Sequence, residues 1–425
     1  MSPDSGKQAH LSSAKRKAAK SSKRKAAKPS KRKAAKPSKR EPAKPSKRKP
    51  AKPSKRKAVK PSKSKPIKPS KSKPVKSSKR KPVKPPKPKP VKPPKPKPIP
   101  IPVASPQPSP SVPVPKGSFE HVVIILKENH TFDNYFGTFP GAEGDSTLAH
   151  ASDPPTGRFS NNHAAWLARA TGAVREQYHQ ADIPSYWAYA QQFTLCDNFF
   201  TDVASDSTPN HLMLIAADSP VINNPSSGSS PSFNLPSLPA NLQAAGLTWR
   251  NYGGFVFSYI AQLKNSPWNV ASPQFATDAV AGTLPSVSWV YPPYLQSEHP
   301  TNNVAYGMQW TVDQVNAIVQ GGLWNKTVIF ISWDDWGGWY DHVTPANIEQ
   351  WTDGTQFRYG SRVPCLVLGP YARAGYISKT LHSFVSVMKF CEENFGVPSI
   401  NQRDGSADNM SDCFDFTQNP LGPPK

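Results

Sequence analysis

An eight-residue repeat near the start of the chain limits which part of it can fold. Eleven copies, among them SSKRKAAK and PSKRKPAK, follow one another through residues 13–100. They contain almost no large apolar side chains, and their like charges repel, so ordering this backbone would lose entropy and bury nothing in return. We predict a disordered Lys/Pro-rich tail over residues 1–116. Its proline-dense copies after about residue 81 are predicted to form an extended polyproline II spacer.

The charge of the chain changes sign at the end of this tail. Residues 1–116 contain 40 Lys and Arg residues against two acidic residues, whereas residues 117–425 contain 14 basic and 26 acidic residues. A flexible cationic chain binds polyanions by releasing their counterions. We therefore predict a polyanion partner for the tail, which is a nucleic acid, an anionic lipid or a cell-wall polymer. A spacer or solubilising role without a dedicated partner stays open.

Residues 117–425 are long enough, and rich enough in aromatic residues, to form one large domain with a substantial core. No run of 18 apolar residues predicts a membrane-spanning helix, and the basic N-terminus lacks the apolar region of a standard secretory signal. From the sequence as given we expect a cytoplasmic protein. The cysteines show no CxxC spacing and leave open two disulfides or none; they are Cys196, Cys365, Cys391 and Cys413.

Short apolar runs alternate with amphipathic segments in this domain. The runs are typical of strands buried on both faces, and the amphipathic segments are typical of helices. The pattern predicts an α/β domain with a mostly parallel central sheet flanked by helices. The predicted strands are 121–126, 327–333 and 364–369, with one or two more within 248–260, and the predicted helices are 183–193, 309–324 and 383–396.

Acidic and amide side chains follow two of these strands directly. Glu128 and Asn129 come after the strand at 121–126, and Asp334 and Asp335 come after the strand at 327–333. Ligands bind at the carboxyl ends of strands in open α/β sheets. Adjacent carboxylates repel one another unless a cation or a proton lies between them, and such oxygens suit a divalent metal. Each pair alone would equally suit a solvated loop or a helix cap.

A group of hydroxyl residues precedes another helical segment. Ser205, Ser207 and Thr208 stand just before Pro209, and an apolar LMLIAA run follows. Proline restricts the residue before it and stiffens the turn. A hydroxyl at this position is a candidate nucleophile or an ordinary N-cap.

Eight short motifs occur in one order along the chain and together resemble a known family. The resemblance covers roughly residues 119–416 and is to the phosphoesterase family of bacterial acid phosphatases and non-specific phospholipases C, whose fold is similar to that of alkaline phosphatases. The motifs are ENHTFDNYFG, FTLCDNFF, STPNH, SEHP, WDDWGGWYDHV, YGSRVPCLVLGPYARAGYIS, LHSFVSVMKFCEENFG and RDGSADNMSDCFDF. Members of this family are often exported.

The resemblance implies a divalent metal, of a kind that the sequence does not identify, and a serine nucleophile. The implied nucleophile is Ser207, with Thr208 as the alternative. A cation lowers the pKa of a hydroxyl and screens phosphate charge, so the serine can attack phosphorus and form a phosphoserine intermediate. The implied metal ligands are Glu128, Asn129, Asp334 and Asp335.

Histidines are the candidates for proton transfer to the leaving group. His299, in SEHP, matches a family position at the phosphate pocket and is our first candidate for a catalytic donor. His342, in YDHV, is a second candidate that also suits a supporting group or a cap. We expect His163, His211 and Asn129 to bind substrate, although a structural role suits His211 equally well.

These features predict a metal-dependent hydrolase of phosphoric esters. Serine at the nucleophile position and the Asp-Asp pair followed by Trp336 favour an acid-phosphatase-like phosphomonoesterase, while Leu381 stands where the family usually has an acidic residue. The alternative enzyme is a phospholipase C that cleaves phospholipid head groups. An alternative of another class is a nucleic-acid-binding or compacting protein with a passenger domain.

Overall fold

The computed structural model of the protein describes residues 112–157, 159–345 and 359–425. These residues belong to one compact unit. The predictions of a disordered tail and a polyproline II spacer fall almost wholly on residues outside this description. Near the start of the described chain, Val114 is buried and its N–H donates to Glu393 Oε2 at 2.8 Å. The chain therefore already packs against the domain at this point.

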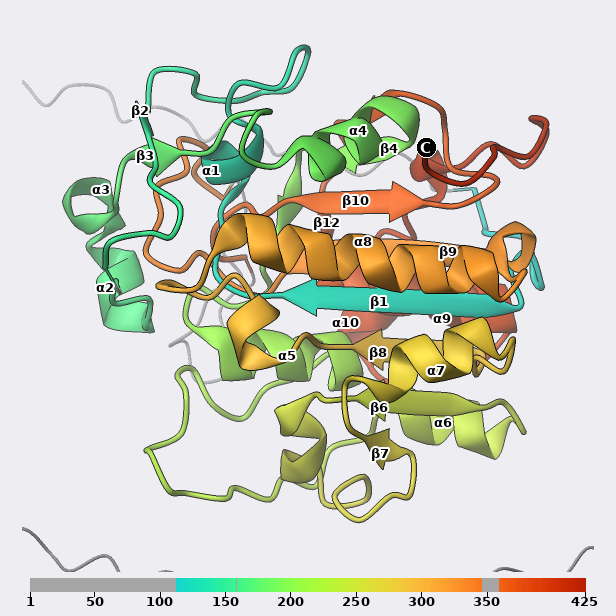
Figure 1. The fold of residues 1–425 in the computed structure, drawn as a ribbon. Helices are drawn as coiled ribbons and strands as arrows, with labels where there is room; N and C mark the ends of the chain where they lie inside the picture. Colours follow the sequence, from blue (N-terminus) through green and yellow to red (C-terminus); the bar gives the residue numbers. More distant parts are fainter. Residues whose placement is uncertain (1–111, 158, 346–358) are drawn as a thin grey trace, which may run out of the picture. The chain divides into compact units, whose positions relative to one another are not determined.

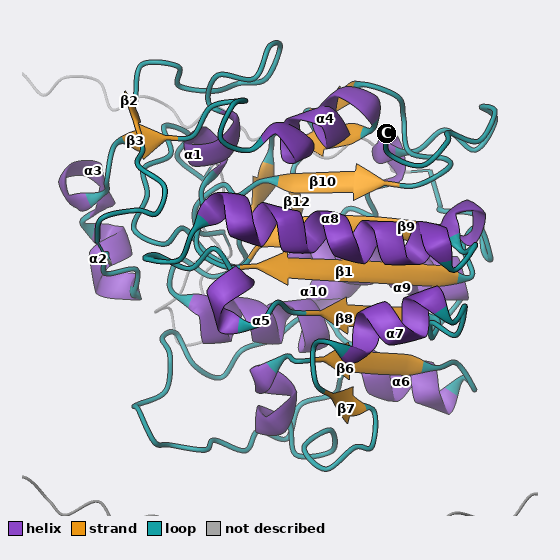
Figure 2. Cartoon of the chain, in the orientation of Figure 1, coloured by secondary structure: helices purple, strands orange, loops and turns teal. Residues whose placement is uncertain are grey.

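An eight-stranded, mostly parallel sheet forms the centre of the domain (Figure 1, Figure 2). From edge to edge its strands are β11 (Tyr376–Ser378), β4 (Thr194–Cys196), β10 (Cys365–Leu368), β9 (Thr327–Trp333), β1 (His121–Lys127), β8 (Val287–Val290), β6 (Trp249–Tyr252) and β7 (Asn269–Val270). β1 pairs in parallel with both β8 and β9, whereas β10 runs antiparallel to its neighbours β9 and β4. The predicted α/β class with a mostly parallel sheet is confirmed.

The three continuous apolar runs predicted as strands form β1, β9 and β10, and every residue of β9 is buried. The stretch 248–260 contains one strand, β6, followed by a 3-10 helix, η1 (Phe255–Tyr259). Gly253 lies between them with a φ of +94°, a conformation that glycine adopts without strain. This glycine ends the strand and redirects the chain.

Helices cover both faces of the sheet. Figure 1 shows α8 (Val304–Gln320) in front of the strands, beside α4 (Pro184–Gln192) and α7 (Gln274–Val280). Behind them lie α5 (Ser207–Ala216), α6 (Leu238–Ala244), α9 (Phe384–Phe395) and α10 (Gln402–Gly405). The predicted helices correspond to α4, α8 and α9. As expected from the sequence, α9 ends at Gly396, whose φ is +66°.

Shorter elements complete the described chain. The helices are α1 (Phe132–Phe136), α2 (His163–Leu167) and α3 (Arg169–Gly172), and the strands are β2 (Ala149–His150), β3 (Glu176–Gln177), β5 (Phe199–Phe200) and β12 (His382–Ser383). The 3-10 helices are η2 (Tyr294–Gln296), η3 (Trp324–Lys326) and η4 (Ser411–Cys413). Among the described residues, no helix has the length and apolar character needed to cross a membrane. All four cysteines are buried free thiols.

The carboxyl ends of β1 and β9 open at the same edge of the sheet, toward which the arrow of β1 points in Figure 1. Lys127 and Trp333, the last residues of these strands, are register partners, so the loops that follow begin side by side. The loops approach closely, because a Cβ atom at Gly337 would lie 2.4 Å from the carbonyl oxygen of Asn129. Gly337 also has a φ of +58°, which favours glycine here.

Candidate active site

Asn129 joins the two loops by hydrogen bonds to both members of the acid pair, Asp334 and Asp335. Its backbone N–H donates to Asp334 Oδ1 at 2.8 Å, and its side-chain amide donates to Asp335 Oδ1 at 3.0 Å. Asn129 has a φ of +65°, a left-handed conformation that costs a residue with a Cβ atom about 1 kcal/mol or more. All three residues are buried. The structure thus brings together side chains that are some two hundred positions apart in the sequence.

Glu128 adds a third carboxyl group to the acid pair. A carboxyl oxygen of Glu128, one of Asp334 and a ring nitrogen of His211 all lie within 4.8 Å of one another. Burial and the charges of Asp334 and Asp335 raise the pKa of Glu128 well above its usual value. Burial and the charge of Asp334 likewise raise the pKa of Asp335. Burial opposes the charge of Asp334 as well, but the hydrogen bond and charge of His211 outweigh it and lower the pKa of Asp334.

The donor atoms of this group fit a divalent cation. Asn129 Oδ1 is buried and has no hydrogen-bond partner among the described protein atoms. Carboxylate and amide oxygens are the ligands that hard divalent cations prefer, and a cation would offset the repulsion among the three carboxylates. Glu128, Asn129, Asp334 and Asp335 are therefore chemically suited to hold such an ion.

Ser207 is the first residue of α5 and contacts the acid pair. Its Oγ donates to Asp335 Oδ2 at 3.0 Å. The neighbouring Thr208 is buried, and its backbone N–H donates to Asn224 Oδ1 at 2.7 Å. Within the described chain, no hydrogen bond joins the Thr208 hydroxyl to the acid pair. Asp206 occupies the N-cap position, and burial raises its pKa to about 6.

His211 lies one helical turn after Ser207, on the same face of α5. Its Nε2 lies 3.1 Å from Asp334 Oδ2, and its ring stacks on Tyr291 with a centroid distance of 5.3 Å. Ser207 and His211 thus each bond a different member of the acid pair. The four-residue spacing within STPNH is the sequence signal for this arrangement, because positions i and i+4 of a helix are neighbours.

The start of α2 and the loop before it bring His163 and an unpredicted residue, Asn161, to the site. The Asn161 amide donates to both carboxylate oxygens of Asp335, at 3.0 and 3.1 Å. His163 Nδ1 lies 2.9 Å from the carbonyl oxygen of Ala204, three residues before the serine. The run SNNH marks this loop as polar, but nothing in it indicates which acid the amides contact. Trp336 Nε1, which donates to the Asn161 carbonyl oxygen at 2.6 Å, fixes the loop against the acid pair.

His299 lies in a neighbouring loop and contacts the site indirectly. Its Nδ1 is 2.6 Å from the carbonyl oxygen of Pro300, and its ring packs on Tyr294. The same loop contacts the metal-ligand candidates, because the Glu128 N–H donates to the Ser297 carbonyl oxygen at 3.0 Å. No hydrogen bond joins His299 to Ser207 or to the acid pair in the residues that the structure describes.

His342 belongs to a separate ionic cluster. Its Nδ1 lies 2.7 Å from Asp133 Oδ2, and Asp133 Oδ1 accepts a hydrogen bond of 2.9 Å from the buried Arg362. Arg362 also pairs with Asp341 at 3.1 Å. Burial raises the pKa of Asp341 to about 6. The structure therefore places His342 among salt bridges that join the loops after β1 and β9, and no hydrogen bond joins it to Ser207 among the residues described.

A buried ion pair lies directly beneath the acid pair. Lys127 Nζ and Glu298 Oε1 are 3.1 Å apart, and both side chains are fully buried. Three further donors saturate the Glu298 carboxylate: the hydroxyls of Tyr135 and Tyr186, each at 2.7 Å, and Trp333 Nε1 at 2.8 Å. Because Lys127 and Trp333 end the strands that carry the candidate ligands, this network fixes where those ligands leave the sheet.

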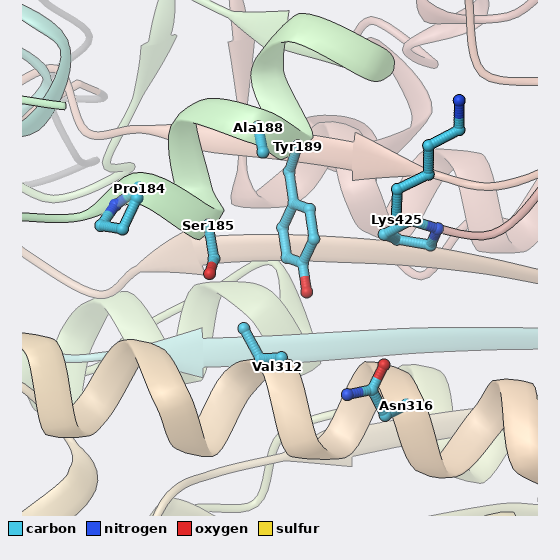
Figure 3. Close-up of a pocket in the computed structure, with 8 residues that line it drawn as sticks. Pro184, Ser185, Ala188, Tyr189, Val312, Asn316 and Lys425 are labelled. Carbon is cyan, nitrogen blue, oxygen red and sulfur yellow. The ribbon is translucent and has the colours of Figure 1, made fainter. Parts of the chain in front are cut away.

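Figure 3 shows a pocket between α4 and α8, in another part of the domain. None of its lining residues is acidic or a histidine, so it offers no phosphate chemistry of the kind described above. They are Pro184, Ser185, Ala188, Tyr189, Val312, Asn316, Pro424 and Lys425.

Comparison with known proteins relates this chain to one family. The model of the Phosphoesterase family matches residues 119–164 and 155–398. The chain is 27% identical over 405 residues to phospholipase C A of Mycobacterium tuberculosis, which covers 71% of this chain and 78% of that relative. It is also 27% identical over 408 residues to the non-hemolytic phospholipase C of Pseudomonas aeruginosa, covering 72% and 58% respectively. Among solved structures, a protein in the alkaline phosphatase superfamily from Vibrio parahaemolyticus is 13% identical with a TM-score of 0.41, covering 73% of this chain and 72% of that one.

Proposed function

The chain belongs to the Phosphoesterase family, and from that premise we propose that it is a metal-dependent hydrolase of phosphoric esters with Ser207 as its nucleophile. One observation carries the proposal. Ser207 Oγ donates a 3.0 Å hydrogen bond to Asp335, within a group of three carboxyl groups. Beside this group is the amide oxygen of Asn129, which has no hydrogen-bond partner in the described part of the chain.

Glu128, Asn129, Asp334 and Asp335 would hold the metal. When bound, a divalent cation at this position supplies Lewis-acid polarisation of the phosphoryl oxygens and lowers the pKa of a nearby hydroxyl.

The first step is attack by Ser207 on phosphorus. The hydroxyl already donates to Asp335 Oδ2, so this carboxylate is placed to take the proton as the bond between Oγ and phosphorus forms. The bond between phosphorus and the ester oxygen breaks, which leaves a phosphoserine. Because Ser207 begins the ten-residue helix α5, the positive end of the helix dipole favours the added negative charge.

The second step returns the free serine. The alkoxide released in the first step takes a proton, for which His299 stays the predicted donor. Water then attacks the phosphoserine and passes a proton back to that donor. The bond between Oγ and phosphorus breaks, inorganic phosphate leaves, and Ser207 regains its proton from Asp335. His211 holds Asp334 in place through this cycle, because its Nε2 is bonded to Asp334 Oδ2.

A phosphomonoester is the first substrate class that we propose, because Ser207 and the Asp-Asp-Trp sequence at 334–336 follow the acid-phosphatase pattern. Cleavage of phospholipid head groups is the second candidate, and it is favoured by the names of the relatives described above, which are phospholipases C.

A substrate comparison separates the two candidates. The full chain is incubated with p-nitrophenyl phosphate and with phosphatidylcholine vesicles, each with added Mg²⁺, Ca²⁺ or Mn²⁺ and each with a chelator. A phosphomonoesterase releases p-nitrophenol, and a phospholipase C releases phosphocholine. Chelation stops either reaction. A metal-supplied, folded protein that turns over neither ester contradicts the proposal.

We propose that the basic tail binds a polyanion and thereby places the domain on it. The support is its charge, because the 40 basic residues of 1–116 release counterions from any polyanion that they contact. The full chain and a chain that begins at residue 112 are compared for binding to DNA and to anionic vesicles over a range of salt concentrations. Affinity that falls steeply with salt for the full chain, and is absent from the shortened one, supports this role. Equal binding by both chains contradicts it.

A further inference from the structure

Two thiols, an imidazole and a carboxylate lie close together where β4, β12 and η4 meet. They are Cys196, His382, Asp412 and Cys413, and we refer to them as the thiol cluster. The two Sγ atoms are 3.6 Å apart, and Cys413 Sγ lies 3.8 Å from His382 Nε2 and 3.7 Å from Asp412 Oδ1. His382 Nε2 lies 3.2 Å from Asp412 Oδ1. This group could not be predicted from the sequence, since no two of its members have CxxC spacing.

These separations have the size expected around one tetrahedral ion. Zinc binds thiolate sulfur at about 2.3 Å and imidazole nitrogen or carboxylate oxygen at about 2.0–2.2 Å, so two ligands of one tetrahedral zinc lie roughly 3.3–3.8 Å apart. Four of the six pairwise separations in the thiol cluster run from 3.2 to 3.8 Å. Cys196 Sγ, Cys413 Sγ and a ring nitrogen of His382 also all lie within 4.8 Å of one another, and Asp412 joins this group through its contacts with Cys413 and His382. Two thiols, an imidazole and a carboxylate also form a donor set of the type that binds zinc.

The atoms behind these donors are arranged as supports for metal ligands. His382 Nδ1, the ring nitrogen that faces away from the thiols, lies 2.7 Å from Asp408 Oδ1. The second carboxylate oxygen of Asp412 accepts hydrogen bonds from Ser378 Oγ at 2.6 Å and Thr380 Oγ1 at 3.0 Å. Metal-binding histidines commonly have a carboxylate beside their other ring nitrogen, and Asp408 lies at ion-pair distance from this nitrogen of His382.

The thiol cluster is mostly buried, unlike the exposed acidic groups that often lie close together on protein surfaces without binding a metal. Cys196, Cys413 and His382 are fully buried, and the Asp412 side chain is about one quarter exposed. Cys196 comes from β4, His382 from β12, and Asp412 and Cys413 from η4, segments that are well separated in the sequence. An ion here would fasten the C-terminal segment to the edge of the central sheet.

We propose that the thiol cluster is a structural Zn²⁺ site, independent of the oxygen-rich site beside Ser207. It holds four protein ligands and leaves no position for substrate, as structural zinc sites do. Its role is to stabilise the fold, because binding to the folded chain alone adds to the free energy of unfolding.

Cobalt distinguishes this site from the oxygen-rich one. Metal-free full-length protein is titrated with Co²⁺, and absorption is recorded in the thiolate-to-cobalt charge-transfer region and in the visible region, where tetrahedral Co²⁺ absorbs strongly. We expect both signals at one Co²⁺ per chain, and their loss when Zn²⁺ is added. Oxygen ligands alone cannot give the charge-transfer signal, so Asp335→Asn keeps it.

Variants locate the ligands. Cys413→Ser and His382→Gln abolish the charge-transfer signal or weaken Co²⁺ binding at least about tenfold. Cys391→Ser, which changes a buried thiol of α9 outside the thiol cluster, leaves it intact. Asp412→Asn alters a partly exposed ligand, so it keeps the test informative if the buried variants do not fold, and it is expected to weaken binding similarly.

Two results overturn the proposal. One is folded wild-type protein that gives no charge-transfer signal with Co²⁺ and binds no Zn²⁺ through its thiols. The other is a disulfide between Cys196 and Cys413, detected by peptide mass spectrometry in protein purified without reductant, which would make the pair a redox site instead.

Discussion

Ser207 and Asp335 are joined by a hydrogen bond of 3.0 Å in which the serine hydroxyl donates to the carboxylate. The bond connects the first residue of α5 with the loop after β9, 128 positions further along the chain. It gives the serine an acceptor for its proton, in a group of carboxyl groups that suits a cation.

Ser207→Ala is expected to lower kcat for phosphate ester hydrolysis by roughly 10³-fold or more, because it removes the atom that attacks phosphorus. Thr208→Ala is the matched control, since the adjacent hydroxyl has no hydrogen bond to the acid pair in the described chain. It should retain activity within a few-fold. Steady-state kinetics and thermal unfolding of both variants check this, and loss of activity in Thr208→Ala with a functional Ser207→Ala would reverse the assignment.

Asp335→Asn is expected to reduce both metal affinity and kcat. The substitution removes a charged ligand and the acceptor of the Ser207 hydroxyl, while the amide still fits between Asn129 and Asn161. Calorimetric titration with Mg²⁺ or Mn²⁺ gives the affinity, and excess metal should restore binding but only part of kcat. Wild-type metal affinity in this variant would show that the ion lies elsewhere.

Helices and strands could be predicted where the apolar run or the helical periodicity extends over many residues. β1 and β9 are seven-residue apolar strands, and α8 and α9 carry clear helical periodicity, so their burial follows from the sequence. β7 has two residues and β11 has three, which is too short for any periodicity. Their strand state comes from pairing with β6 and β4, a tertiary effect that local sequence does not encode.

The candidate site was predictable to a similar degree. The positions of Glu128, Asn129 and the acid pair follow from two strands that end at one edge of a parallel sheet. The contact between Asn161 and Asp335 could not be predicted, because it depends on how Trp336 holds a long loop. The position of His342 beside Asp133 depends in the same way on Arg362, which comes from a distant segment.

Glu298→Gln is expected to destabilise the protein by about 3–5 kcal/mol, because it leaves the charge of Lys127 buried and uncompensated. Burial already lowers the pKa of Lys127, against the attraction of Glu298. The double variant Lys127→Met with Glu298→Gln also removes the buried charge of Lys127 and should recover part of the lost free energy of unfolding. Denaturant unfolding gives the free energy of unfolding of the wild type and of both variants. If Glu298→Gln is as stable as the wild type, the ion pair does not stabilise the fold.

Stability is expected to fall as pH rises, in part because of Glu392 in α9. Burial raises the pKa of Glu392 from 4.5 to about 9. Between these values the unfolded chain has already lost the proton that the folded chain keeps, so raising the pH favours unfolding. Glu392→Gln should flatten this slope, whereas Glu120→Gln, at an exposed residue paired with Lys326, should keep it. Thermal unfolding from pH 5 to 9 gives the slopes, and identical slopes in the wild type and Glu392→Gln would contradict this assignment.

The central claim is that Ser207 becomes phosphorylated during turnover beside a bound metal. Rapid acid quenching of the metal-supplied enzyme with p-nitrophenyl phosphate, followed by peptide fragmentation, tests this directly. The account predicts phosphate on Ser207, none on it after chelation, and slower phosphorylation of Ser207 in Asp335→Asn than in the wild type. Rapid turnover with phosphate on Thr208, or with no phosphorylated residue at any quench time, would contradict it.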